Sequence, residues 1–153
     1  MELNIQGIFT SKLIVVHDTD NLSDADSLMN NYNIRHLPVI DKNGYLCGIL
    51  SRSDYVALKF VDSRLSNFNV RTLMTAPVVV VSSKTLIRDV AQLFIKKKIS
   101  SVVVSDGAEA IGIITTEDLI RFLAYNVEFM NAEEPLDISA LADEGWISNT
   151  TVS

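Results

Sequence analysis

Two four-residue segments of the sequence combine a hydroxyl side chain with a carboxylate three residues later. They are Ser51-Arg52-Ser53-Asp54 and Thr115-Thr116-Glu117-Asp118. Such a pair forms a capping box when the two side chains bond the free N–H groups that open a helix. The same helix start suits phosphate, and a carboxylate there can accept hydrogen bonds from both vicinal hydroxyls of a ribose. On the residues alone capping is the favoured interpretation, and nucleotide binding is the alternative.

Patterns for catalysis and metal binding are sparse in this sequence. His17 and His36 are the two histidines, and they do not stand at a metal-ligand spacing. Cys47 is the one cysteine, so an internal disulfide and a cysteine zinc site are excluded, and its place in a predicted strand indicates an inert core thiol. Gly-x-Ser-x-Gly, Gly-x-Gly-x-x-Gly and Walker patterns do not occur. We therefore expect a protein that is not an enzyme and has no catalytic cofactor.

Length and composition predict a globular chain with a sizeable core. The chain has 153 residues, of which 48% are hydrophobic and 21% charged, which fits one domain or two small repeats packed as one. Its longest apolar runs are a few residues, far short of the roughly 20 that a membrane span needs. No signal-peptide pattern opens the sequence, and the single cysteine fits a reduced compartment. We therefore expect a cytoplasmic protein without a membrane span.

The net charge of −6 is concentrated at the C-terminal end. Six acidic residues and no basic ones follow Asn126, so the first 125 residues carry as many bases as acids. The one basic run, Lys96-Lys97-Lys98, closes a helical pattern and there complements the helix dipole. Because a neutral body with an acidic tail offers no broad basic field, we expect no nucleic-acid partner.

The sequence contains two copies of one pattern. A shift of 65 residues aligns Thr10 with Thr75, Asp24 with Asp89, Ile34 with Ile99 and Val39 with Val104. After a turn the shift becomes 64, which aligns Gly48 with Gly112 and Asp54 with Asp118. We therefore expect a leader at 1–8, a first repeat at 9–65, a linker at 66–73, a second repeat at 74–128 and an acidic tail at 129–153.

Each copy predicts the same order of elements, β-α-β-β-α. Apolar β-branched runs predict buried strands, and apolar residues spaced by three and four predict amphipathic helices. The predicted strands are 13–16, 37–40 and 46–50 in the first copy and 78–81, 102–105 and 110–114 in the second. A helix follows each first strand, and another opens near Ser53 or Glu117. Three strands with two helices cannot cover both faces of a sheet, so we expect an α/β fold of the α+β type, with the repeats packed as one pseudo-symmetric module.

Several stretches carry a resemblance to a known family. Residues 34–41 read Ile-Arg-His-Leu-Pro-Val-Ile-Asp, and 48–54 and 112–118 share a Gly-Ile-x-Ser/Thr-x-x-Asp signature. Phe9-Thr10 and Met74-Thr75 precede the first strands. Over about 9–125 the chain resembles a tandem pair of cystathionine-β-synthase (CBS) domains, also called a Bateman module. The second copy departs from the family at Val102-Val103-Val104, where a Pro usually precedes Val.

The resemblance implies an adenine nucleotide in the cleft between the repeats: AMP, ADP or ATP, with S-adenosylmethionine less expected. It implies that Asp54 and Asp118 bind ribose and that Ser51 and Thr115 lie near the phosphates. In related modules each cleft also takes the opening segment of the opposite repeat. This adds Thr75, Ala76 and Pro77 to the Asp54 site and Thr10, Ser11 and Lys12 to the Asp118 site. Aliphatic residues that would flank adenine, but that fit plain core equally well, are Val80 and Ile34 in the first site and Val15 and Ile99 in the second.

The two copies differ in their cationic residues. Arg35, His36 and Arg52 are expected near the Asp54 cleft. The matching positions of the second copy hold Ser100, Ser101 and Thr116, followed by Glu117. Arginine suits bidentate contact with phosphate, although a solvated surface position explains Arg52 equally well. We therefore expect the Asp54 site to bind phosphorylated ligands and the Asp118 site to stay weak or empty.

By the same resemblance, the chain is a regulatory sensor module that reports its nucleotide to an unidentified partner protein by a conformational or oligomeric change. Related modules form homodimers through their helices, and apolar positions after Asp54 and Asp118 permit a homodimer here. The alternative is a ligand-free dimerisation scaffold of the same fold, in which both motifs only cap helices.

Overall fold

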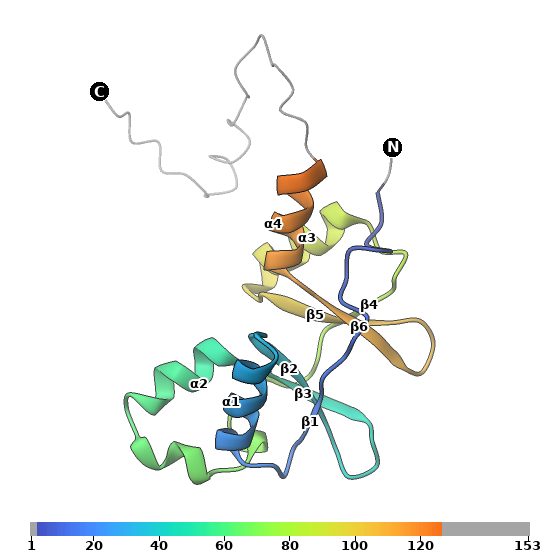
Figure 1. Cartoon of the computed structure of the whole chain (residues 1–153). Helices are drawn as coiled ribbons and strands as arrows, with labels where there is room; N and C mark the ends of the chain where they lie inside the picture. Colours follow the sequence, from blue (N-terminus) through green and yellow to red (C-terminus); the bar gives the residue numbers. More distant parts are fainter. Residues whose placement is uncertain (1–2, 127–153) are drawn as a thin grey trace, which may run out of the picture.

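The computed structural model describes residues 3–126, which form two three-stranded sheets, each with its own pair of helices (Figure 1). The first repeat contains β1 (Val16–His17), α1 (Leu22–Asn31), β2 (His36–Ile40), β3 (Leu46–Ser51) and α2 (Arg52–Lys59). The second contains β4 (Val80–Val81), α3 (Ile87–Lys97), β5 (Ser101–Ser105), β6 (Ala110–Thr115) and α4 (Thr116–Asn126). Two 3₁₀ helices, η1 (Ser63–Asn67) and η2 (Val70–Thr72), connect them. The predicted β-α-β-β-α order is confirmed in both copies.

The two sheets have the same topology and matching registers. In each, the first strand runs parallel to the second, and the second runs antiparallel to the third. Val39 faces Gly48 in one repeat, Val104 faces Gly112 in the other, and each hairpin shifts register directly after that pair. The sheets of the two repeats are therefore equivalent in backbone, so the side chains around them distinguish the two sites.

The chain segments in front of β1 and β4 cross to the opposite repeat. Thr10 forms an antiparallel bridge with Ile113 of β6, with N–O distances of 2.9 and 3.0 Å. Thr75 forms the matching bridge with Ile49 of β3, at 2.8 and 3.0 Å. In Figure 1 the N-terminal segment, in dark blue, runs along the second repeat before it reaches β1. The first strand of each repeat is shorter than the run predicted at 13–16 or 78–81.

The crossing of these segments explains the glycine of each Gly-Ile-x-Ser/Thr-x-x-Asp signature. A Cβ on Gly112 would lie 2.3 Å from Cδ2 of Phe9 and 2.7 Å from the backbone oxygen of Thr10. A Cβ on Gly48 would lie 2.5 Å from Sδ of Met74. Because non-bonded heavy atoms pack at about 3.5–4.0 Å, these strands need a residue without a side chain where the crossing segment passes.

Each repeat has its own hydrophobic core, completed by a segment from outside its predicted bounds. Ile5, expected in a leader, is fully buried in the second core, and Val70, expected in a linker, is fully buried in the first. Burial of one such side chain contributes about 1.5–3 kcal/mol. The acidic tail expected at 129–153 lies outside the described residues. Other buried core members are Val16, Leu22, Met29, Leu37 and Leu50 in the first repeat and Val90, Phe94, Val102, Val104 and Ile114 in the second.

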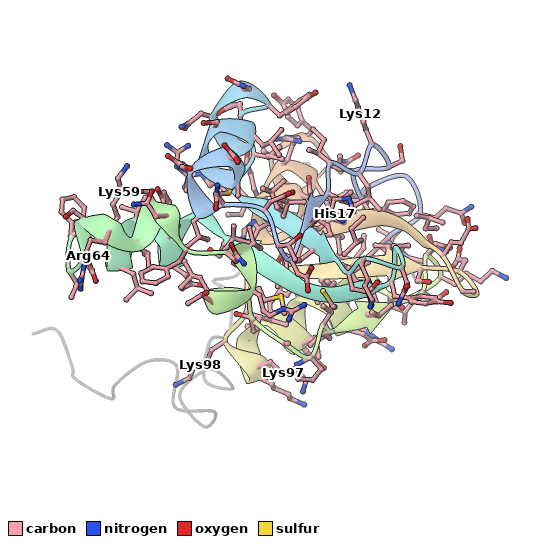
Figure 2. The ribbon with its side chains drawn as sticks, turned by 90° about the horizontal axis from the view of Figure 1, so that it is seen from below. Lys12, His17, Lys59, Arg64, Lys97 and Lys98 are labelled. Atoms are coloured by element: carbon pink, nitrogen blue, oxygen red, sulfur yellow. The ribbon has the colours of Figure 1, made fainter. Side chains whose placement is uncertain are left out.

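Basic side chains are spread over separate parts of the described surface. Figure 2 shows Lys59 and Arg64 at one end of the molecule, Lys97 and Lys98 around the end of α3, and Lys12 on another side. Among residues 3–126, no helix combines the length and apolarity that crossing a bilayer requires.

Candidate functional site

A cavity of about 550 Å³ lies between the repeats. Three separate segments line it: the crossing segment before β1, the start of β2 in the first repeat, and the end of β6 with the first turns of α4 in the second. The lining residues are Thr10, Lys12, Leu13, Ile14, 33–36, Pro38, Ile113, 115–118, Ile120 and Arg121. The cavity therefore joins residues that are about 80 to 110 positions apart in the sequence.

The carboxylate of Asp118 is held inside its own repeat. It is 7% exposed, and its Oδ2 accepts from the backbone N–H and the hydroxyl of Thr115 at 2.8 and 2.9 Å. Thr115 Oγ1 in turn accepts from the Asp118 N–H at 3.3 Å. These contacts form the predicted capping box. The other oxygen, Oδ1, lies 3.7 Å from a guanidinium nitrogen of Arg121.

Asp54 is held differently, although its motif is the same. Ser51 caps α2 by accepting from the Ser53 N–H at 3.2 Å. The Asp54 side chain is exposed and makes no hydrogen bond to any described residue. The capping box is thus complete only at 115–118, and Asp54 is a free carboxylate.

Arg35 and His36 of the first repeat lie between the two helix starts: the Arg35 carbonyl accepts from the Arg52 N–H at 2.8 Å, and His36 pairs with Ser51 across the β2–β3 ladder. Both residues also line the cavity that contains Asp118, and their binding role beside Asp54 stays a prediction. Ile34, predicted to flank a base beside Asp54, lines the same cavity. The prediction grouped residues by repeat, whereas the cavity combines the start of β2 from one repeat with the start of α4 from the other. Lys12 and Thr10 join Asp118 as predicted.

The remaining predicted residues lie outside this cavity. Arg52 opens α2, where its backbone N–H donates to the Arg35 carbonyl at 2.8 Å, and Thr75 bridges to Ile49. Ala76 and Pro77 follow Thr75 and are exposed. Of the other aliphatic candidates, Val15 and Val80 are exposed and Ile99 packs on the second core. Ser11 is exposed next to Lys12.

His36 connects the two repeats. Its Nε2 is 2.8 Å from the hydroxyl of Ser100, the residue that matches Arg35 in the second copy. Burial lowers the pKa of His36 below 6.5, an effect that Asp54 opposes, Arg35 reinforces and Asp118 again opposes. The imidazole is therefore neutral at pH 7, and the fixed charges facing the cavity from the first repeat are those of Lys12 and Arg35.

The sequence interpretation missed Arg121. Its Nη2 donates to Oε1 of Glu117 at 3.0 Å, and its side chain lines the cavity. The spacing of three from Asp118 and four from Glu117 places it on the same helix face, which could have identified it.

The half-buried Cys47 packs on the first core, and burial raises the pKa of its thiol. The described residues include no cluster of side chains suited to a metal ion.

Comparison with known proteins matches both repeats to one family. The model of the CBS domain matches residues 5–59 and 70–125. The CBS domain pair of protein MJ0100, solved with 5′-methylthioadenosine and S-adenosyl-L-methionine, is 26% identical, with a TM-score of 0.72 over 81% of this chain and 98% of that one. The structure of CBSX2 with AMP is 29% identical, with a TM-score of 0.66 over 80% of this chain and 96% of that one.

One curated relative is much longer than this chain. L-aspartate semialdehyde sulfurtransferase of Methanocaldococcus jannaschii is 29% identical over 118 residues, which are 76% of this chain and 22% of that protein. The match therefore covers one part of a larger protein.

Proposed function

The chain belongs to the CBS domain family and carries two CBS domains in tandem, and we propose that it is a regulatory module that binds an adenine nucleotide in the cavity around Asp118. CBS-pair proteins are in general regulatory modules rather than enzymes. In this proposal the nucleotide ties the two repeats into one arrangement, and a partner protein responds to that arrangement.

The observation that carries the proposal is that side chains from both repeats line one cavity. Lys12 and Arg35 come from the first repeat and Asp118 from the second. In the proposed complex Asp118 Oδ1 accepts from the ribose hydroxyls, since Oδ2 is occupied by Thr115. The two cations bind the phosphates, and Ile14 and Ile34 flank the base.

The charge of the cavity favours AMP, ADP or ATP over other adenosine ligands. Lys12 and Arg35 attract phosphate but repel the sulfonium of S-adenosylmethionine. Relatives of this fold have been solved with both kinds of ligand, AMP in one case and S-adenosyl-L-methionine in another. In this proposal Lys12 and Arg35 are the residues of this chain that discriminate between the two kinds of ligand.

A nucleotide titration tests the proposal. Adenosine phosphates should raise the melting temperature of the purified chain, and guanosine phosphates should not, because only a ligand of the folded state stabilises it. Thermal-shift measurements with both series, followed by calorimetry, provide the comparison. A flat response to every adenine ligand at millimolar concentration would contradict nucleotide binding.

A ligand-free scaffold is the second candidate, and the complete capping box at Asp118 favours it. In that case the motif needs no ligand to explain it. Mass spectrometry of small molecules released from the denatured protein discriminates between the two functions. A co-purified adenine compound supports the sensor, whereas a clean spectrum together with the flat titration supports the scaffold.

We also propose a homodimer that buries apolar side chains of α2 and α4. Large hydrophobic residues directly after α2 and on α4 are strongly exposed: Phe60 89%, Val61 81%, Leu123 56% and Tyr125 83%. A second copy of the chain is the occupant that these two helices would suit, since the repeats present equivalent faces. Light scattering should give a dimer that Leu123→Glu dissociates. Tyr45→Glu, at an exposed position on the β2–β3 turn, should leave it intact.

A further inference from the structure

The cavity contains a second carboxylate whose charge conflicts with a phosphorylated ligand. Glu117 and Asp118 both line it. Asp118 has a proposed partner in the ribose of the ligand. Glu117 has no proposed partner in the ligand, and the Glu117 side chain is 68% exposed. The matching residue of the first repeat is Ser53, so the extra negative charge belongs to this site alone.

Arg121 lies one turn further along α4 and faces both acids. Its Nη2 is 3.0 Å from Oε1 of Glu117, and its Nη1 is 3.7 Å from Oδ1 of Asp118. The residue that matches Arg121 in the first repeat is Ala57. The second repeat therefore has both the additional acid and the arginine that pairs with it, and the first repeat has neither.

We propose that Arg121 is a positioning residue that gives this cavity its preference for phosphorylated ligands, by neutralising Glu117. The inference rests on the proposed nucleotide binding and extends it from the class of ligand to the charge that the site accepts. With Glu117 paired, Lys12 and Arg35 are left to the ligand. Lys12 lies over the ring of Tyr32, 5.8 Å from its centre, and Arg35 makes no ion pair with the described residues.

The size of this effect on binding depends on the charge of the ligand and on the salt concentration. Glu117, Lys12 and Arg35 line one cavity of about 550 Å³, and salt screens charges closer than roughly one Debye length, 8–10 Å, only in part. An unpaired Glu117 would repel a ligand in proportion to its phosphate charge, and an uncharged adenosine would be little affected. An exposed ion pair one helical turn apart adds little to folding, so α4 should tolerate its removal.

The test is calorimetry of the full chain with adenosine, AMP and ATP in magnesium-free buffer. The variants are Arg121→Gln, Glu117→Gln and the double substitution. Arg64→Gln is the matched control, because Arg64 is also ion-paired, to Asp62 at 3.0 Å, and lies far from Lys12 in Figure 2. Thermal unfolding of each variant establishes that it is folded.

Arg121→Gln should weaken ATP binding about tenfold, AMP binding less, and adenosine binding by under about twofold. Adding Glu117→Gln should return ATP affinity to within about threefold of the wild type, and Arg64→Gln should change none of the three by more than about twofold.

Two results would overturn this role of Arg121. One is an equal loss of adenosine and ATP affinity in Arg121→Gln. The other is a double variant as weak as the single one, which would give Arg121 a direct phosphate contact instead. If the unmodified chain binds none of the three ligands, the nucleotide proposal itself has failed and the selectivity role fails with it. That failure is distinguishable because it appears before any substitution is made.

Discussion

One sequence motif opens the helices after β3 and β6, but the aspartate of the motif differs in burial and hydrogen bonding between the two. Asp118 is buried and accepts two hydrogen bonds from Thr115, whereas Asp54 is exposed and makes none with the described residues. The backbones that carry them have the same topology and register. A shared motif therefore fixes where a carboxylate lies, and the neighbouring side chains decide whether it caps a helix.

The surroundings of the two carboxylates differ as sharply. Asp118 shares its cavity with three cationic side chains, Lys12, Arg35 and Arg121. The residues at the matching positions around Asp54 are Pro77, Ser100 and Ala57, with Arg52 as the nearby cation. The described cavity thus gathers cations around Asp118, whereas the sequence predicted them around Asp54.

The largest expected difference between the repeats concerns their signature glycines. Gly112→Ala should cost about 1–3 kcal/mol of stability, because the new Cβ meets the backbone oxygen of Thr10 as well as the ring of Phe9. Gly48→Ala should cost less, about 1 kcal/mol or below, since it meets only the flexible Met74 side chain. Denaturant unfolding of both variants measures this. Equal costs would mean that the two crossing segments pack with the same rigidity.

The next contrast is between two arginines of the first repeat. Arg35→Ala should weaken ATP binding about tenfold or more, since hydrogen bonds to charged groups contribute roughly 1.5–3 kcal/mol. Arg52→Ala should change it by less than about twofold, because Arg52 lies outside the cavity. Calorimetry at two salt concentrations should also find a weaker wild-type affinity in the higher salt. A larger loss of ATP affinity in Arg52→Ala than in Arg35→Ala would indicate that the phosphates bind beside Asp54.

The capping difference predicts unequal stabilities in the absence of ligand. Asp118→Ala should lower the free energy of unfolding by about 1–2 kcal/mol, because it leaves the Thr115 N–H without its acceptor. Asp54→Ala should lower it by no more than about 0.5 kcal/mol, the scale of a charge near an exposed helix dipole. Urea denaturation of the two variants decides the point, and similar losses would contradict the hydrogen-bond assignment.

The smallest effect is the pH dependence of the interface between the repeats. Burial lowers the pKa of His36 from 6.5, so the unfolded chain binds its proton first as the pH falls. The contribution of the neutral imidazole is therefore complete above pH 6.5 and is lost as the pH falls through the lowered value. His36→Gln should flatten this part of the stability profile. An unchanged slope in His36→Gln would contradict this prediction.

Much of the fold could be predicted because its signals are local. The apolar runs and turns gave the strands to within a few residues, and helices expected near Ser53 and Glu117 begin at Arg52 and Thr116. The burial of Ile5 in the second core and of Val70 in the first core, from an expected leader and linker, could not be predicted in this way. This burial depends on pairing across the whole chain, as in the bridge from Thr10 to Ile113.

The same limit applies to the candidate site. The shift of 65 residues correctly matched Arg35 with Ser100, but a match between copies does not tell which carboxylate a side chain faces. Arg35 lines the Asp118 cavity because the start of β2, the crossing segment before β1 and the start of α4 lie together there. No single sequence motif contains all three segments. The crossing itself was implied by resemblance, and that implication agrees with the positions of Thr10 and Lys12.

A crystal structure of the chain grown with ATP tests the central claim most directly. We predict one ATP per chain in the cavity between the repeats, with its ribose at Asp118 and its phosphates against Lys12 and Arg35. ATP bound instead beside Asp54 and Arg52, with the Asp118 cavity empty, would contradict the account.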